Sequence, residues 1–288
     1  MPEPLQLRVA LGKHDHVKPI RDGRVTSKRM TFNLIEYDPL PKAFRLMARG
    51  GDLDVSEMAL VTHFLAHSFG KPITAIAIPL WSRLPHTNLV CPENSDVRGA
   101  ADLSGHIVGV RSYAQTSGVW VRGVLADQYG LDLDAMTWGT MEDAHLAEYA
   151  DPSNTRRYTP PPSLRDLMMN GEFAAIMGER VVDPAGIRTV VPDAEAAAHD
   201  WMRRTGIHPI NHVLAAKTEL VANHPWLPEE LMDMFSRARE IAIADGAEPP
   251  PEYGLEPNRA SLQLCMQFTA DQRVTHQAYG IDEMFCQV

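Results

Sequence analysis

One segment near the middle of the chain combines an apolar run with a polar loop that contains a single arginine. Residues 105–111 are typical of a short buried strand, and residues 119–125 of a helix. The loop between them contributes the guanidinium of Arg111 and the hydroxyls of Ser112, Thr116 and Ser117. Unpaired backbone N–H groups and the positive end of a helix dipole suit such a loop to bind a carboxylate or a phosphate. The alternative is an ordinary strand-to-helix connection capped by a serine or threonine.

A second polar loop, residues 13–16, places two imidazoles on either side of Asp15. His14 and His16 have the chemistry for proton transfer or for metal binding. Because adjacent residues rarely all reach one metal, we favour proton transfer or substrate contact by His16 over metal binding. The alternative is a solvated loop in which Asp15 bonds a neighbouring imidazole.

Three further charged residues follow expected strands. A buried Glu57 would be costly without a partner, so we expect it to face a cleft or to meet an arginine, unless it caps the next helix. Arg83 ends an apolar run, where its fork suits carboxylate recognition or a salt bridge between lobes. Glu179, in the polar loop 178–180, is expected to contact substrate.

The segment from His208 to His212 adds two imidazoles and the amide of Asn211 around Pro209. The proline fixes the backbone as the chain enters an expected strand. We expect His212, and with it His208 and Asn211, to line a cleft. The alternative is a core histidine bonded to a backbone carbonyl.

Strands alternate with helices along the chain, and the pattern restarts near residue 106. The expected strands are 6–11, 30–37, 50–58, 73–80, 106–111, 135–140, 173–177 and 211–216. The expected helices are 39–48, 60–68, 119–129, 163–170, 193–204, 228–244, 258–268 and 271–285. Such alternation predicts an α/β fold whose sheets are mixed and mostly parallel.

The restart predicts two lobes joined by crossovers near residues 87–96 and 204–213. Lobe 1 would comprise residues 1–94 and 206–288, and lobe 2 residues 95–205. Ligands of parallel sheets bind outside the carboxyl ends of the strands. We therefore expect a cleft between the lobes, in which Arg111 and His212 meet.

The composition narrows the class of protein. The 288 residues are 44% hydrophobic and 22% charged, and the net charge of −10 argues against general nucleic-acid binding. We expect no membrane span, because no apolar run reaches about 18 residues, and no secretory signal in the first residues. Three distant cysteines form neither a disulfide framework nor a metal motif, so a cytoplasmic location is expected. No nucleophile-elbow, P-loop or dinucleotide-binding glycine pattern occurs.

Several segments together resemble the 4,5-dihydroxyphthalate decarboxylase family. They run in order through nearly the whole chain, and the arginine-containing loop is the most specific. The segments are His14–His16, Asp54–Met58, Ser82–Arg83, Val110–Gly123, Glu142–His145, Pro209–His212 and Asn223–Trp226. This family is similar in fold to type 2 periplasmic solute-binding proteins but works in the cytoplasm. The resemblance thus implies the same two-lobed fold with a cleft between the lobes.

The resemblance implies loss of one carboxylate from 4,5-dihydroxyphthalate, giving protocatechuate and carbon dioxide in phthalate catabolism. Arg83 and Arg111, with the loop hydroxyls, would hold the carboxylates. His16 and His212 would be the catalytic pair, one ionising a ring hydroxyl and the other protonating a ring carbon. No cofactor is expected, because the ring serves as its own electron sink. The expected partners are this small aromatic carboxylate and further copies of the chain in a homo-oligomer, with no nucleic acid or membrane.

Three alternatives stay open. The chain could be a non-catalytic binder or sensor of aromatic acids. It could also decarboxylate a related aromatic carboxylate. A metal-dependent decarboxylase that uses His14 or His16 is the third possibility.

Overall fold

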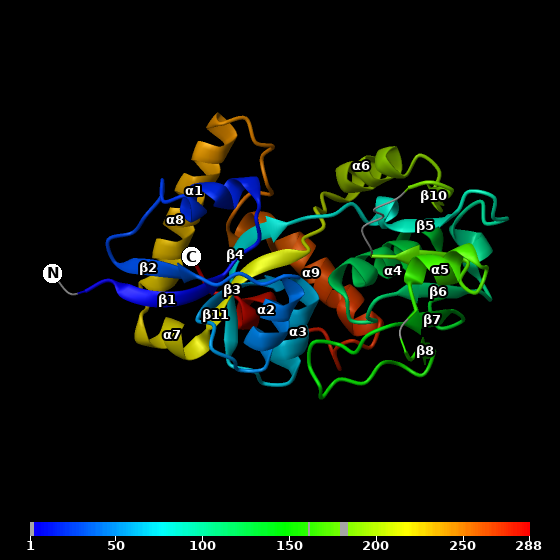
Figure 1. Ribbon diagram of the computed structural model, residues 1–288, viewed down its shortest axis with the longest axis horizontal. Helices are drawn as coiled ribbons and strands as arrows, with labels where there is room; N and C mark the ends of the chain where they lie inside the picture. Colours follow the sequence, from blue (N-terminus) through cyan, green and yellow to red (C-terminus); the bar gives the residue numbers. More distant parts are fainter. Residues whose placement is uncertain (1–2, 161, 179–183) are drawn as a thin grey trace. The chain divides into compact units, whose positions relative to one another are not determined.

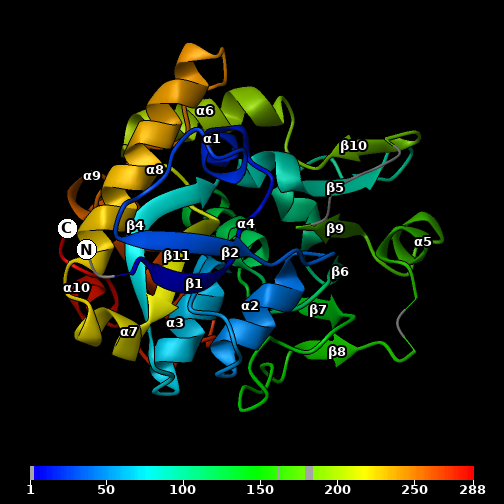
Figure 2. The same ribbon diagram turned by 60° about the vertical axis from the view of Figure 1, so that its left-hand side comes forward.

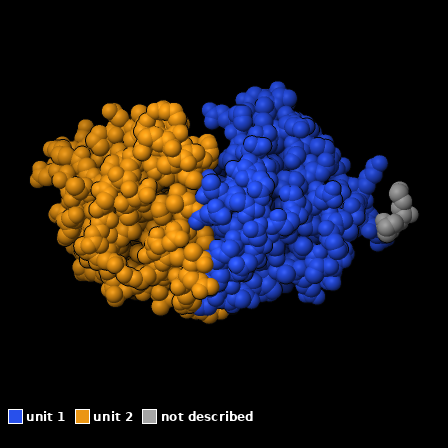
Figure 3. Space-filling view, turned by 180° about the vertical axis from the view of Figure 1, so that it is seen from behind, with its two compact units in different colours: residues 1–82, 210–263, 279–288 blue, residues 83–209, 264–278 orange. Residues whose placement is uncertain are grey.

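The computed structural model describes residues 3–160, 162–178 and 184–288, which form two compact units (Figure 1). The first unit comprises residues 1–82, 210–263 and 279–288, and the second comprises residues 83–209 and 264–278 (Figure 3). The units differ from the expected lobes in their boundaries. The chain passes from one unit to the other at residues 82/83 and 209/210, whereas the expected boundaries were 94/95 and 205/206. In addition, residues 264–278 belong to the second unit.

The first unit is built on a five-stranded mixed sheet in the order β2-β1-β3-β11-β4. Strand β1 is parallel to β2 and β3, whereas β11 is antiparallel to β3 and β4. The strands are β1 (Leu5–Ala10), β2 (Met30–Leu34), β3 (Val55–Ala59), β4 (Ile73–Trp81) and β11 (His212–Lys217). The carboxyl ends of β1 and β3 therefore lie side by side, and β11 begins beside the end of β3.

Helices cover both faces of this sheet. Helix α8 (Leu227–Ala244) packs Leu231 and Phe235 into a core that includes Val9 and Ile76 of the strands. Figures 1 and 2 draw α8 on one side of the sheet and α2 (Pro41–Ala48) and α3 (Leu60–Ser68) on the other. The remaining helices of this unit are short. They are η1 (Asp15–Val17), α1 (Lys18–Arg21), α7 (Thr218–Asn223) and α10 (Ile281–Met284).

The second unit contains a six-stranded mixed sheet in the order β10-β5-β9-β6-β7-β8. Its strands are β5 (Leu89–Pro92), β6 (Ile107–Val110), β7 (Thr137–Thr140), β8 (Thr155–Arg157), β9 (Ala175–Met177) and β10 (Ile187–Thr189). Its helices are η2 (Pro85–Asn88), η3 (Ala100–Leu103), α4 (Thr116–Tyr129), α5 (Leu164–Met169) and α6 (Ala194–Thr205). The residues of α9 (Leu255–Asp271) are divided between the units. The α/β class with two mixed sheets is confirmed.

The expected helix over residues 271–285 is wrong. Helix α9 ends at Asp271, and Arg273 adopts a left-handed backbone with φ of 58°, which stops the helix. Only the short α10 follows, after Gly280. Short strands β5, β8 and β10 were not expected, because three or four residues carry too little periodicity to be recognised.

Within the described part of the chain, no helix combines the length and the apolar character needed to cross a membrane.

Candidate active site

Glu57 is a fully buried carboxylate in the middle of the central strand β3. The Nδ1 atom of His212 lies 2.5 Å from its Oε1 atom, and the Nε2 atom of His14 lies 3.0 Å from both of its oxygens. The backbone N–H of Gly12 donates to Oε2 at 2.7 Å. An ionised carboxylate only accepts, so the two imidazole nitrogens are donors. Three donors from two segments of the first unit thus converge on one carboxylate.

The sheet register explains this convergence. Ala10 pairs with Ser56, so the chain that follows β1 passes directly beside Glu57. In the antiparallel pair, Leu214 faces Glu57 and His212 faces Ala59. Glu57 and His212 are therefore diagonal neighbours on one face of the sheet.

Gly12 provides room for the contact between His14 and Glu57. A Cβ atom at this position would lie 2.4 Å from the Nε2 atom of His14 and 2.8 Å from the Oε2 atom of Glu57. No side chain fits there without displacing the imidazole or the carboxylate. The residue also donates its N–H to that carboxylate, so the backbone itself is part of the site.

The donors determine the charge of Glu57. Burial alone raises the pKa of a carboxyl group, but the hydrogen bonds from His14 and His212 outweigh burial and hold the pKa of Glu57 far below its usual range. The carboxylate stays ionised at neutral pH and stabilises any positive charge that either imidazole acquires. Of the two situations expected for Glu57, a cleft or an arginine partner, the arginine is not among its described partners, which are imidazoles and a backbone amide, and the cleft stays a prediction.

Aromatic rings surround His212. Its ring centre lies 4.7 Å from that of Trp81 and 4.9 Å from that of Phe44, with Phe44 edge-on. Only 15% of the His212 side chain remains exposed. The imidazole is thus fixed by a carboxylate on one nitrogen and by ring packing, as a proton-transfer group requires.

His16 is placed differently from the other two imidazoles. Its ring stacks on His14 with centres 5.5 Å apart and planes 6° apart, and it makes no bond to Glu57. Burial, helped by the nearby imidazole of His14, lowers the pKa of His16 to about 4. Its buried Nε2 atom has no hydrogen-bond partner among the described residues.

The arginine-containing loop of the second unit connects β6 to α4. Gln115 occupies the position before the helix and makes no side-chain cap, so the alternative of a serine or threonine cap is wrong. Ser112, Thr116 and Ser117 are all buried, and the Ser112 hydroxyl has no partner among the described residues. The Ser112 hydroxyl is therefore available for a purpose other than capping the helix.

Contacts to one carbonyl hold this loop beside the end of β9. Arg83 donates from Nη1 to the carbonyl of Gly178 at 3.0 Å, and Gln115 donates from Nε2 to the same oxygen at 2.9 Å. The Ser117 hydroxyl is 3.5 Å from it. Arg111 pairs with Glu142, at 3.1 Å between Nη1 and Oε2, with both side chains partly exposed.

Arg122 is a residue that the sequence reasoning missed. It is completely buried in α4, where it donates from Nη2 to the carbonyl of Tyr113 at 2.6 Å and from Nε to Gln272 at 2.7 Å. Its guanidinium carbon lies 4.0 Å from the centre of the Tyr113 ring. These contacts fix the middle of the loop. The available signal was an arginine one helical turn after Gly118 in an otherwise apolar helix.

The other expected site residues belong to different units or lie outside the described residues. His208 is exposed in the second unit. Asn211 is buried in the first, with its N–H bonded to the carbonyl of Trp81. Glu179 lies outside the described residues. Arg111 and His212 belong to different units, and their meeting in one cleft stays a prediction. Among the described residues, no three His, Cys, Asp or Glu side chains are arranged to hold a metal ion.

Comparison with curated proteins finds two of similar sequence. A curated 4,5-dihydroxyphthalate decarboxylase of Comamonas testosteroni is 27% identical over 252 residues, 83% of this chain and 76% of the relative. A second, from Pseudomonas putida, is 27% identical over 213 residues, 69% of this chain and 82% of the relative. The resemblance to 4,5-dihydroxyphthalate decarboxylases is confirmed. No family model matches the chain.

Solved structures confirm the fold. The periplasmic aliphatic sulphonate binding protein SsuA of Escherichia coli matches with a TM-score of 0.65 at 15% identity, over 99% of this chain and 98% of that one. A Candida albicans protein with the periplasmic binding protein fold matches with a TM-score of 0.57 at 14% identity, over 98% of this chain and 93% of that one. The desulfurization enzyme DszB matches with a TM-score of 0.58 at 12% identity, over 98% of this chain and 96% of that one. The chain therefore has the periplasmic-binding-protein-like fold.

The low pKa of His16 predicts a specific loss of stability in mild acid. Native His16 stays neutral down to about pH 4, whereas the unfolded chain binds a proton there from about pH 6.5. Unfolding then takes up a proton, so stability is lost as the pH falls from 6.5 to 4. His16→Asn should reduce this loss by up to about 3 kcal/mol, measured by urea unfolding at pH 7 and pH 4.

His199→Asn is the matched control for this measurement, because it removes an exposed imidazole from α6. It should leave the pH dependence close to that of the parent protein. An unchanged slope in the His16 variant would contradict a neutral, buried His16.

Proposed function

We propose that this chain is a non-oxidative decarboxylase of a hydroxylated aromatic dicarboxylate, with 4,5-dihydroxyphthalate as substrate and protocatechuate and carbon dioxide as products. The observation that carries the proposal is the buried Glu57 bonded to both His14 and His212. Similarity to two decarboxylases of that name supports the reaction class.

The chemistry needs one proton donor and one proton acceptor. One imidazole of the His14–Glu57–His212 group takes the proton of the hydroxyl para to a carboxylate, and the oxygen electrons shift into the ring. The other, as imidazolium, delivers its proton to the ring carbon that bears this carboxylate. The bond to the carboxylate then breaks, carbon dioxide leaves, and the bonding electron pair restores the aromatic ring. The hydroxyl recovers its proton, so the net change is one proton gained and one carbon dioxide lost.

Glu57 suits both half-steps. Its negative charge stabilises whichever imidazole is protonated, and its two oxygens orient both rings. His16 does not share these bonds, and with a pKa of about 4 it is neutral at physiological pH. The proposal therefore gives the proton transfers to His14 and His212, and moves His16 from a catalytic to a substrate-contact role.

The loop around Arg111 is proposed to recognise the carboxylates. It combines an arginine, three buried hydroxyl side chains and the start of a 14-residue helix. Arg111 is held by Glu142, an exposed pair that an incoming carboxylate replaces at little cost. The oligomeric state and the cytoplasmic location stay predictions.

The first test is direct. Purified protein incubated with 4,5-dihydroxyphthalate should release carbon dioxide and form protocatechuate, followed by chromatography. Phthalate should give neither product, because it has no para hydroxyl from which electrons can enter the ring. A second incubation with a chelator distinguishes the proposed reaction from the metal-dependent alternative. For a metal-dependent enzyme, activity would disappear with the chelator and return when a divalent ion is added.

A non-catalytic binder is the second candidate, favoured by the fold shared with a sulphonate binding protein. It would bind the aromatic acid in calorimetry but release no carbon dioxide. The match to a desulfurization enzyme shows that this fold also occurs in an enzyme.

Glu57→Gln tests the centre of the mechanism. The amide keeps the size of the side chain but loses the charge, so kcat should fall about 100-fold or more with little change in KM. Asp54→Asn is the matched control, because Asp54 accepts from the Arg8 backbone and Lys217 but contacts no imidazole. Equal effects of the two variants, in proteins with normal circular dichroism, would refute the role of Glu57.

Arg111→Ala tests carboxylate recognition. Losing a charge-assisted hydrogen bond worth about 1.5–3 kcal/mol should raise KM roughly 10- to 100-fold in steady-state kinetics. Arg157→Ala serves as control, since it removes another partly exposed arginine that pairs with an aspartate, Asp143, in the same unit. A normal KM in the Arg111 variant would remove this assignment.

A further inference from the structure

Several buried polar atoms of the first unit have no hydrogen-bond partner among the described residues, and three of them come from neighbouring side chains. They are the Nε2 atom of His16, the hydroxyl of Tyr253 and the Nε atom of Arg239. The His16 and Tyr253 rings are edge-to-face with centres 6.4 Å apart, and the guanidinium carbon of Arg239 lies 5.7 Å from the Tyr253 ring centre. Unpaired polar atoms are costly in a protein interior, so their grouping points to a polar ligand.

The group adjoins the proposed proton-transfer residues. His16 stacks on His14, which bonds Glu57. His16 itself is 92% buried, being 8% exposed, whereas the His14 side chain keeps 21% of its surface exposed. A ring that reaches His14 therefore has its edge close to His16.

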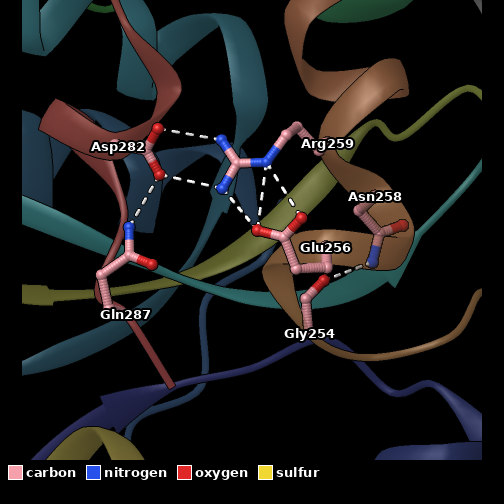
Figure 4. Close-up of polar contacts among 6 residues, drawn as sticks. All are labelled: Gly254, Glu256, Asn258, Arg259, Asp282 and Gln287. Atoms are coloured by element: carbon pink, nitrogen blue, oxygen red, sulfur yellow. Dashed lines mark hydrogen bonds and ion pairs between the residues drawn. The ribbon is translucent and has the colours of Figure 1, made fainter.

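Tyr253 is held in place by the start of α9. The side chain of Asn258 donates from Nδ2 to the carbonyls of Glu252 and Gly254, at 2.7 and 2.8 Å, on either side of the tyrosine. Figure 4 shows the bond to Gly254. Gly254 has a φ of 109°, which a residue with a side chain rarely adopts, and it donates its N–H to Ala77 of β4 at 2.7 Å.

A charged network secures the same helix start. Arg259 bonds both Glu256 and Asp282, and Asp282 also accepts from Gln287 (Figure 4). These contacts join the first turn of α9 to the C-terminal segment. Tyr253 therefore sits at a fixed point of the fold rather than on a free loop.

The three side chains match an aromatic hydroxyl. Tyr253 has a hydroxyl that both donates and accepts hydrogen bonds. The Nε2 atom of neutral His16 either donates or accepts, depending on the tautomer of the ring. Arg239 adds a positive charge, which favours the partial negative charge on a hydroxyl oxygen that is giving up its proton. A carboxylate is matched less well, since Glu57 lies close by and repels it.

We propose that Tyr253, together with His16 and Arg239, binds a ring hydroxyl of the aromatic substrate and so selects hydroxylated over plain phthalates. This inference rests on the proposed function for the class of ligand. It makes Tyr253 a specificity-determining residue, which no part of the sequence pattern had indicated.

The test compares two ligands that differ only in their hydroxyls. Calorimetry in the Glu57→Gln background, in which turnover is expected to fall about 100-fold or more with little change in KM, should show tighter binding of 4,5-dihydroxyphthalate than of phthalate. Tyr253→Phe removes one oxygen and keeps the ring, so affinity for 4,5-dihydroxyphthalate should fall about 10-fold while affinity for phthalate is unchanged. Tyr158→Phe is the matched control, since that hydroxyl bonds Glu172 in the second unit, and it should change neither affinity.

The outcomes separate this inference from the proposed function, because binding is measured without turnover. Carbon dioxide release by the parent protein, with ligand discrimination unchanged in Tyr253→Phe, would refute the hydroxyl site alone. Loss of discrimination in a protein that releases no carbon dioxide would support the site and refute the decarboxylase. Equal loss for both ligands would also count against the inference, because it indicates a general packing role for Tyr253. Arg239→Gln, in α8, provides a second variant with the same expected selective loss.

Discussion

The first unit depends on a carboxylate that has been removed completely from water. An unpaired ion in such a place would cost several kcal/mol, so Glu57 requires donors that arrive with good geometry. They come from Gly12 after β1, from His14 in the next turn and from His212 at the start of β11. Residues separated by 155 positions in sequence are thereby tied to one side chain. A shift of one residue in either strand would turn Glu57 or His212 to the opposite face and break the group.

The same constraint prepares the imidazoles for chemistry. Each ring uses one nitrogen on Glu57, which fixes the orientation of the ring and leaves the other nitrogen for a ligand. Phe44 and Trp81 limit the movement of His212 from two sides. The interaction that compensates for burying the carboxylate is thus also the one that positions the two imidazoles proposed as proton donor and proton acceptor. Stability and the proposed reaction depend on the same atoms in this unit.

The strands and helices that carry this group were predictable because they are long or strongly periodic. Helix α3 has the expected bounds, and β1, β4 and β11 differ by a residue at one or both ends. The polar residues at strand ends were predictable as site candidates for the same reason. Their pairing was not, because partner choice depends on the register between β3 and β11, which no local pattern encodes. Arg122 and Tyr253 were missed because burial of a polar side chain is a property of the packed fold.

Arg122 also supports the proposed anion site in an acidic protein with a net charge of −10. Its guanidinium is fully buried, bonds neutral oxygens of Tyr113 and Gln272, and keeps one buried nitrogen without a partner among the described residues. Burial lowers its pKa, yet a guanidinium stays charged in proteins. No described carboxylate bonds it, so its charge is little compensated locally and adds to the positive end of α4. The loop at that helix start thus combines a fixed cation with buried hydroxyls, which suits the carboxylate recognition proposed for it whatever the charge of the outer surface.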